Sequence, residues 1–226
     1  MARFARVVAA HVPHHVVQRG NRRQPVFFSS ADYKSYLQLM SVWCAEERVE
    51  VWAYCLMPNH VHLIAVPASE LGLSRAIGEA HRRYTVRVNE RENWRGYLWQ
   101  GRFSSCPLDE QYLLTGVRYV ELNPVRAGLA ERAWRYPWSS AAAHMRGKDD
   151  ILVTGKPMLE RVADWRRFLA SEPDSTDMEI LRRNSRTGRP LGSPRFVKRL
   201  EARLGRALAP GKPGPKPHGV RRLRTR

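Results

Sequence analysis

The stretch that decides the fold is residues 49–66, VEVWAYCLMPNHVHLIAV. Two runs rich in β-branched and aromatic residues, 49–56 and 60–66, are separated only by the tripeptide MPN. Such runs favour strands, and a connection this short favours a hairpin. His60 and His62 stand two residues apart in the second run. Because side chains alternate along a strand, both histidines are expected on the same face of the sheet.

Further strand and helix patterns flank this hairpin on both sides. They predict a strand at 14–19, a helix capped by Ser30, a helix at 72–91, a fourth strand at 97–105, and a helix at about 110–123 that Asp109 caps and Pro124 closes. The resulting order is strand, helix, two strands, helix, strand and helix. This order is typical of the ferredoxin-like, split βαβ arrangement, an α+β fold with an antiparallel sheet and its helices on one face.

Charge and composition limit the classes of partner. The 226 residues include 39 Lys and Arg against 21 Asp and Glu, a net charge of +18. Residues 1–181 carry 24 basic and 20 acidic groups, a net +4, whereas 182–226 carry 15 and one, a net +14. This favours an acidic partner, with nucleic acid ahead of a membrane surface. A compositional bias toward arginine is the alternative explanation.

Other features place the protein in a reducing compartment, away from membranes. No apolar run approaches the ~20 residues of a membrane span. The three cysteines, Cys44, Cys55 and Cys106, are odd in number and irregularly spaced, which argues against a disulfide framework. Charged residues interrupt the first twelve positions before a signal-peptide core can form. We therefore expect a soluble, cytoplasmic protein.

The histidine pair has the spacing of a metal site. Two imidazoles on one strand face can reach a single ion, although two half-exposed sheet histidines would produce the same pattern by coincidence. The helix GVRYVELNPVRAG supplies Tyr119 and Asn123, four residues apart and hence one turn apart. An amide oxygen is a hard ligand suited to Mg²⁺ or Mn²⁺, and a tyrosine one turn away is placed to attack what the metal polarises. Tyr112, seven residues earlier, is a rival nucleophile whose position favours packing.

Four segments together resemble one family. The segments MPNHVHLI (57–64), RYVELNPVRAGL (118–129), HHVVQRGNRRQPVFF (14–28) and LWQGRFSS (98–105) resemble the REP-associated tyrosine transposases, domesticated relatives of insertion-sequence transposases with a histidine–hydrophobic–histidine (HUH) motif and a single tyrosine. The resemblance covers about residues 5–145, and RTGRPLGS (186–193) resembles the C-terminal extensions of these proteins. The resemblance implies that His60, His62 and Asn123 bind the metal and that Tyr119 is the nucleophile.

The same resemblance implies an activity and a partner. Members of the family nick and rejoin single-stranded DNA beside hairpins of REP-like repeats, through a 5′-phosphotyrosine and with Mg²⁺ or Mn²⁺. The implied protein is a monomer or homodimer associated with the nucleoid. Two alternatives stay open: a non-catalytic DNA-binding protein that kept the fold, and a metal-dependent phosphodiesterase that uses activated water while Tyr119 is only structural.

Basic and aromatic residues near these motifs are candidates for DNA contacts. We expect a basic loop after the first strand, stacking and phosphate contacts from the fourth strand, and arginines flanking Tyr119; the residues are Arg19, Asn21, Arg22, Arg23, Trp99, Arg102, Arg118 and Arg126. Trp94, Trp99 and Phe103 can equally fill the core.

The chain divides by pattern and charge into three parts. Residues 1–145 form the expected catalytic domain, and 146–181 form a helical linker with a short helix at 159–169. Residues 182–226 form a basic, partly disordered extension in which Ser193 and Pro194 start a further helix.

Overall fold

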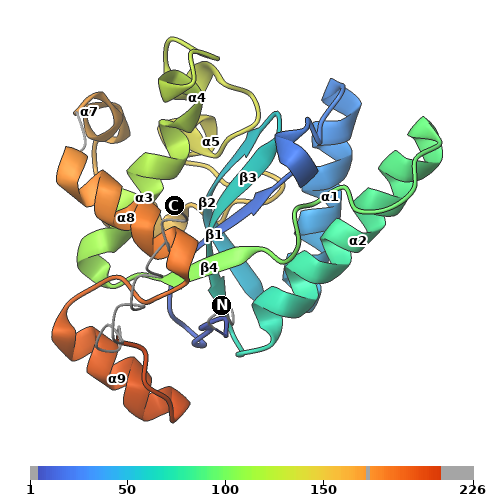
Figure 1. The fold of residues 1–226 in the computed structure, drawn as a ribbon. Helices are drawn as coiled ribbons and strands as arrows, with labels where there is room; N and C mark the ends of the chain where they lie inside the picture. Colours follow the sequence, from blue (N-terminus) through green and yellow to red (C-terminus); the bar gives the residue numbers. More distant parts are fainter. Residues whose placement is uncertain (1–4, 172–173, 210–226) are drawn as a thin grey trace, which may run out of the picture.

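A computed structural model describes residues 5–171 and 174–209. Four strands form one antiparallel sheet in the order β2-β3-β1-β4 (Figure 1). The strands are β1 (His14–Arg19), β2 (Val49–Met57), β3 (His60–Pro67) and β4 (Ser104–Pro107). Met57 pairs with His60 across a two-residue turn, so the hairpin is present as predicted. The element order and the strand order confirm the α+β, ferredoxin-like arrangement.

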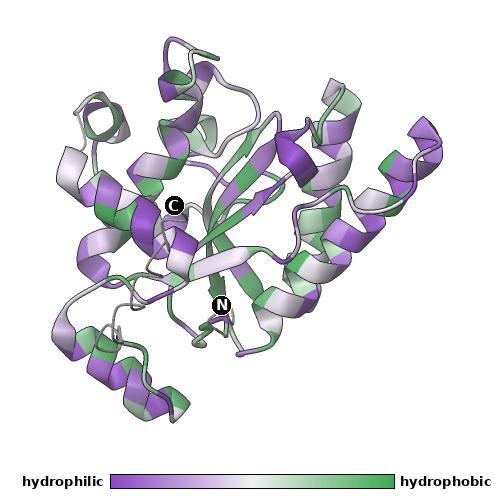
Figure 2. Cartoon of the chain, viewed as in Figure 1, coloured by the Kyte–Doolittle hydropathy of each residue, from purple (hydrophilic) through white to green (hydrophobic). Residues whose placement is uncertain are grey.

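Two long helices cover one face of the sheet (Figure 1). They are α1 (Ser30–Glu46) and α2 (Gly72–Glu92). The cap of α1 is Ser29 rather than Ser30, because Ser29 and Asp32 form a reciprocal capping box. Tyr36, Tyr84 and Leu63 lie in the core beneath these helices and are fully buried. Figure 2 shows apolar residues concentrated on the central strands.

A second layer of helices covers the opposite face (Figure 1). It contains α3 (Glu110–Glu121), α5 (Ala141–Arg146), α7 (Trp165–Ala170) and α8 (Ser175–Thr187). Ile64, Cys106 and Val117 belong to its core. Ile64 lies on the same face as His60 and His62, because side chains two residues apart on a strand project to the same side. The sequence predicted helices on one face only, whereas α3 and helices from beyond residue 145 cover this second face.

The fourth strand is shorter than predicted and begins later. The expected range was 97–105, whereas β4 spans Ser104–Pro107. Gly96 and Gly101 both adopt left-handed backbone conformations, with φ of +94° and +64°, which interrupt an extended ladder. Before β4, this segment meets the end of the first strand at an isolated bridge between Gly20 and Trp99 and at a hydrogen bond that Nε2 of Gln18 donates to the Gly101 carbonyl.

The helix that carries Tyr119 ends before Asn123. The prediction of one helix over 110–123 is wrong: α3 stops at Glu121, Leu122 forms the junction, and a separate turn, α4 (Asn123–Arg126), follows. Pro124 cannot donate a backbone hydrogen bond, which accounts for the break. The side chain of Asp109 accepts a hydrogen bond from the amide of Tyr112, as predicted for the cap.

The C-terminal part differs in detail from its prediction. The helix expected at 159–169 is two short helices, α6 (Lys156–Leu159) and α7 (Trp165–Ala170). The helix α9 (Pro194–Leu204) starts as predicted, with Ser193 as its cap. Two 3₁₀ turns, η1 (Asn21–Arg23) and η2 (Ala133–Arg135), complete the described elements.

The expected extension is only partly described. The boundary placed at residue 181 falls inside α8, which continues to Thr187. The basic segment 210–226, for which disorder was expected, lies outside the described residues. Within 5–171 and 174–209, no helix has the length and apolar character that crossing a membrane requires.

Candidate active site

His60 and His62 start β3 and project from the face that α3 covers. Their ring centroids are 4.9 Å apart, and the rings meet edge to face. Gly20 lets the chain turn tightly into η1 beside the turn before His60, because a Cβ at this glycine would lie 2.4 Å from the carbonyl oxygen of Gln24 and 3.4 Å from that of Asn59. The amide of Gly20 donates to the carbonyl of Asn59 in that turn. The start of β3 is therefore held by β1, where Arg19 pairs with His60, and by β2, where Met57 pairs with His60.

Tyr119 lies against the histidine pair. Its ring centroid is 5.5 Å from that of His62 and 5.6 Å from that of His15 on β1. The three side chains meet because α3 packs across the sheet face that carries His62. The structure therefore brings the predicted nucleophile to the predicted metal-binding pair.

The proton arrangement of His60 follows from its neighbour Asn59. Nδ1 of His60 lies 2.6 Å from Oδ1 of Asn59, whose Nδ2 donates to the carbonyl of Arg23. An amide oxygen only accepts, so Nδ1 of His60 carries the proton and Nε2 keeps its lone pair. Burial and the charge of Arg19 lower the pKa of His60 to about 4, so the ring is neutral at pH 7. A neutral imidazole with a free Nε2 is a metal ligand.

His62 is buried and also neutral. Burial, followed by the neighbouring His15, His60 and arginine side chains, lowers the pKa of His62 well below its usual range. Its Nδ1 lies 3.0 Å from Nε2 of His15, and the two rings stack at 5.2 Å between centroids. The hydrogen bond at Nδ1 leaves Nε2 for a ligand.

Asn123 is the remaining predicted ligand. Its side chain is buried at the start of α4, and its Nδ2 has no hydrogen-bond partner. Amide oxygen and nitrogen can exchange places by a flip, so this orphaned amide can present Oδ1 instead. No hydrogen bond among the described residues joins Asn123 to His60 or His62. The donor set of two imidazoles and one amide suits a divalent cation such as Mg²⁺ or Mn²⁺.

A basic cleft opens beside the histidines and Tyr119. Its volume is about 780 Å³. Three of the predicted DNA-contacting residues, Arg19, Arg23 and Arg102, line it. Two further arginines, Arg182 and Arg186, come from α8. This concentration of arginine beside the predicted nucleophile suits a phosphate-bearing ligand.

Arg126 lies directly against the tyrosine. Its guanidinium is 4.3 Å from the centroid of the Tyr119 ring, and it donates a hydrogen bond to the Tyr119 carbonyl. Arg118 points elsewhere, since it lies over the ring of Phe168 at 4.3 Å. Asn21 and Arg22 lie in η1, outside the residues that line the cleft.

Trp99 is a core residue rather than a base-stacking platform. It is 6% exposed and stacks on His81 at 4.5 Å between ring centroids. Phe103 is similarly buried, and Arg6 covers its ring. A buried ring offers no free face to a nucleotide base, so the prediction for Trp99 is wrong. The alternative of core packing is the one observed for Trp99 and Phe103, whereas Trp94 is 43% exposed.

Sequence reasoning missed several residues of the site. It treated His15 only as a strand residue, although the same-face register with Ile64 and Cys106 could have placed it beside His62. It also missed Gln18, which is buried at the cleft with an unpartnered Oε1. For the α8 arginines the charge of the extension was the only signal.

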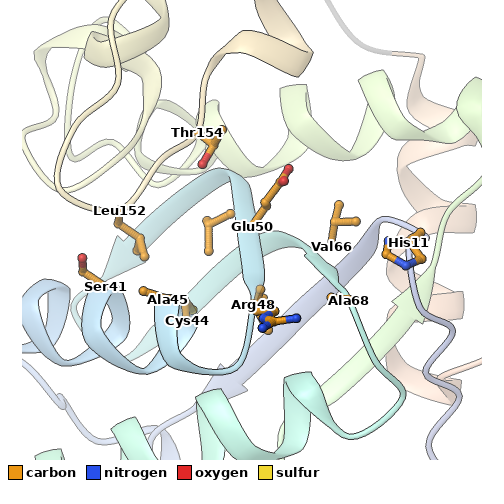
Figure 3. Close-up of a pocket in the computed structure, with 12 residues that line it drawn as sticks. His11, Ser41, Cys44, Ala45, Arg48, Glu50, Val66, Ala68, Leu152 and Thr154 are labelled. Carbon is orange, nitrogen blue, oxygen red and sulfur yellow. The ribbon is translucent and has the colours of Figure 1, made fainter.

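A second pocket lies at another part of the sheet and contains none of the predicted site residues. It measures about 420 Å³ and is bordered by α1, β2 and the segment 152–154 (Figure 3). Figure 3 shows Arg48, Glu50 and Thr154 around it. Its lining includes neither the histidine pair nor a tyrosine, so the cleft remains the candidate site.

Known proteins resemble this chain in sequence and in fold. The sequence model of the family described as "Transposase IS200 like" matches residues 9–123, just over half of the chain. The structure of a REP-associated tyrosine transposase bound to a REP hairpin has a TM-score of 0.57 and 20% identity, covering 67% of this chain and 90% of that one. A candidate transposase from Deinococcus radiodurans R1 has a TM-score of 0.38 and 18% identity, over 53% and 96%. No curated protein matches the sequence.

These similarities agree with the features built from the residues. The family match spans both the HUH pair and Tyr119, and it ends at Asn123. The likeness to the REP-associated tyrosine transposase is a likeness of fold, and it agrees with the α+β arrangement predicted from the sequence. The chain belongs to the family of IS200-like transposases.

Proposed function

We propose that this protein nicks and rejoins single-stranded DNA beside hairpins, through a covalent bond between Tyr119 and a 5′-phosphate. The observation that carries the proposal is the meeting of the Tyr119 ring with the His60–His62 pair at the edge of an arginine-lined cleft. A REP hairpin is the ligand of the structurally similar transposase, which supports hairpin DNA of REP-like repeats as the substrate class.

The reaction is an exchange of one phosphodiester bond for another. The Tyr119 oxygen forms a bond to phosphorus while the bond from phosphorus to the 3′-oxygen breaks. The phenol proton is lost, and the departing 3′-oxygen takes up one proton, so no co-reactant is consumed. Because the phosphotyrosine conserves the energy of the diester, a 3′-hydroxyl of another strand can reverse the step.

The residues for a divalent cation are Nε2 of His60, Nε2 of His62 and the amide of Asn123. A bound Mg²⁺ or Mn²⁺ supplies Lewis-acid polarisation of the scissile phosphate at this site. The two histidines contribute lone pairs that their neutral state keeps available. The position of Tyr119 beside His62 keeps the nucleophile within the same pocket.

The arginines of the cleft hold the DNA backbone. Arg19, Arg23 and Arg102 line the cleft together with Arg182 and Arg186 of α8. Guanidinium groups bind phosphate oxygens in a bidentate manner, which positions a strand without reading its sequence. Gln18 lies buried beside the cleft, where its Nε2 donates to the Gly101 carbonyl and so ties β1 to the segment that carries Arg102.

One chain contains every residue of this proposed site. His60, His62 and Tyr119 meet within the same polypeptide, so we expect a monomer to be active. Specific activity that is constant across a dilution series agrees with this. A loss of specific activity on dilution, together with a dimer in solution, would assign the site to a homodimer.

A covalent-adduct assay tests the function. The protein is incubated with Mn²⁺ and a pool of hairpin oligonucleotides that have randomised single-stranded flanks and a 3′-fluorescein. On a denaturing gel, the 3′ label is expected to travel with the protein, because the downstream fragment keeps the 5′-phosphate bound to tyrosine. Tyr119→Phe is expected to abolish the labelled band, whereas Tyr112→Phe, on the same helix, is expected to retain it.

The same gel separates the other functions. Cleavage without a labelled protein band would indicate a phosphodiesterase that uses water. Retention of the oligonucleotides in a native gel, with no cleavage under any metal, would indicate a DNA-binding protein without catalysis. A labelled band that persists in Tyr119→Phe and disappears in Tyr112→Phe would move the nucleophile to the rival tyrosine.

A further inference from the structure

A chain of buried hydrogen bonds connects α8 to the histidine pair. The Ser185 hydroxyl lies 2.7 Å from the carbonyl oxygen of Leu181 and 2.7 Å from Nδ1 of His15. Nε2 of His15 lies 3.0 Å from Nδ1 of His62. Ser185, His15 and His62 are each less than 8% exposed. Water therefore has little access to replace the hydrogen-bond partners of these three side chains.

The direction of each hydrogen bond follows from the number of protons available. A carbonyl oxygen only accepts, so the single hydroxyl proton of Ser185 points to Leu181. The Ser185 oxygen must then accept from His15, which places a proton on Nδ1 of His15. His15 is 1% exposed and contacts no carboxylate among the described residues, so the buried ring is neutral and its Nε2 carries no proton.

The same accounting extends to His62. Since Nε2 of His15 can only accept, Nδ1 of His62 must be the donor in the bond between them. His62 is neutral, so a proton on Nδ1 leaves the lone pair on Nε2. His60 reaches the same state independently through Asn59. Both histidines of the pair then present Nε2 in the same form.

We propose that Ser185 and His15 are positioning residues that fix His62 in the tautomer with the proton on Nδ1. Without them, His62 would be free to adopt the opposite tautomer, in which Nε2 is protonated and cannot bind a metal. The functional use of the Nε2 lone pair rests on the proposed function. The tautomer itself is a property of the protein alone.

The source of this control lies outside the part of the chain that defines the family. The family match ends at residue 123, whereas Ser185 lies on α8, 170 residues after His15. The helix α8 also contributes Arg182 to the cleft and over the Tyr119 ring, at 5.7 Å. The proposal therefore gives α8 a role in organising the active site as well as a role in binding phosphates.

The first measurement is the tautomer of His62 in the metal-free, full-length protein. Long-range ¹H–¹⁵N correlation spectra distinguish a protonated from an unprotonated imidazole nitrogen. We expect a proton on Nδ1 of His62 in the wild type. In Ser185→Ala and His15→Phe we expect a shift toward the tautomer protonated on Nε2. His15→Phe keeps a ring against both His62 and Tyr119, and Ser185→Ala keeps the helix.

The second measurement is the affinity for Mn²⁺ alone, followed by calorimetry. Loss of an outer-shell partner typically weakens metal binding by about 10–100-fold. We expect Ser185→Ala to weaken binding by about tenfold and Ser185→Thr, which keeps the hydroxyl, to restore it. Thr187→Ala is the matched control, because Thr187 also bonds back to its own helix but is not part of the chain of contacts. This control is expected to match the wild type.

The outcomes separate the proposal from the proposed function. A wild-type His62 protonated on Nε2, or a tautomer that does not change in Ser185→Ala and His15→Phe, overturns the positioning role even if the DNA adduct forms. A tautomer that shifts in both variants supports the positioning role even if no DNA adduct forms. In that second case only the proposed function fails.

Discussion

The guanidinium of Arg126 lies 4.3 Å from the centre of the Tyr119 ring and donates a hydrogen bond to the Tyr119 carbonyl at 2.7 Å. The two residues are joined across the break between α3 and α4. Arg126 therefore both fixes the end of α3 and places a positive charge beside the proposed nucleophile. A charge so placed stabilises the negative charge that develops on the tyrosine and phosphate oxygens.

Replacement of Arg126 tests this relationship. We expect Arg126→Gln to slow formation of the DNA adduct by about 100-fold, the scale of one preorganised electrostatic contact. The measurement is the single-turnover rate on a hairpin oligonucleotide at saturating protein. Arg135→Gln is the control, because Arg135 is exposed and contacts only Glu131 and the backbone nearby. Equal rates of adduct formation for the two variants would show that Arg126 does not contribute to the reaction.

The histidine pair is expected to separate cleavage from binding. His60→Ala removes one proposed metal ligand and is expected to reduce cleavage below detection while DNA affinity stays within severalfold. Chelation of divalent ions in the wild type is expected to have the same effect, with activity restored by Mn²⁺. The readouts are the adduct gel and a filter-binding titration. Undiminished cleavage by His60→Ala would exclude the proposed metal site.

The α8 arginines are expected to determine part of the salt dependence of DNA binding. Each phosphate contact releases counterions, so loss of one basic residue lowers the slope of log affinity against log salt by about 1. We expect Arg182→Gln with Arg186→Gln to lower the slope by about 2. Arg195→Gln, on the exposed side of α9 and away from the cleft, is expected to leave it unchanged. If the double variant and the wild type have the same slope, Arg182 and Arg186 do not contact the bound DNA.

Stability is expected to fall in mild acid because histidines are buried as neutral rings. Burial lowers the pKa of His14 to about 4, against about 6.5 in the unfolded chain. As the pH falls through this window, the unfolded state takes up a proton that the folded state does not, so the free energy of unfolding decreases. His14 alone is expected to contribute about 2 kcal/mol of this loss between pH 7 and pH 5.

Urea unfolding at both pH values measures this effect. In the fold, Nδ1 of His14 bonds to the carbonyl of Val12, and its Nε2 accepts from the amide of Ala9. His14→Gln has a donor and an acceptor but does not titrate, so its loss between pH 7 and pH 5 is expected to be smaller than that of the wild type. His11→Asn, at an exposed position with φ of +56°, is expected to behave as the wild type. Identical losses in all three proteins would contradict the assignment to His14.

Glu121 is expected to hold the C-terminal layer against the sheet. This fully buried carboxylate accepts hydrogen bonds from Ser140, His144 and Trp165. Removal of one member of such a network leaves polar groups unpaired, so Glu121→Ala is expected to lower the free energy of unfolding by about 3–5 kcal/mol. Glu131→Ala, at an exposed pair, is expected to cost less than about 0.5 kcal/mol. Chemical denaturation checks both values.

Local patterns in the sequence were sufficient for the hairpin and for the residues on it. The alternation of residues 49–66 predicts both strands and places His60 and His62 on one face, which the register of β2 with β3 confirms. The cap at Asp109 and the start of α9 at Ser193 also follow from local signals. These features depend on backbone periodicity and capping, which a few neighbouring residues determine.

Prediction failed where local patterns compete with distant packing. Trp99 lies beside Arg102 in the sequence, yet the core formed by His81 and Tyr36 encloses its ring. The fourth strand was placed too early because its aromatic residues favour a strand, whereas Gly101, with a positive φ, interrupts one within the expected range. The separation of Asn123 from the helix of Tyr119 depends on one proline, whose position alone does not say whether the helix ends or bends.

By itself the sequence determined the antiparallel α+β fold and the same-face histidine pair, and it indicated Tyr119 as the proposed nucleophile. Only the tertiary structure decided that His15 and Ser185 lie behind His62 and that α8 forms one wall of the cleft. The physical reason is sequence distance. His15 and Ser185 are 170 residues apart, and the pattern of apolar residues around each one does not predict that they touch. Such a contact arises when the second helical layer closes over the sheet and each buried polar group must find a hydrogen-bond partner.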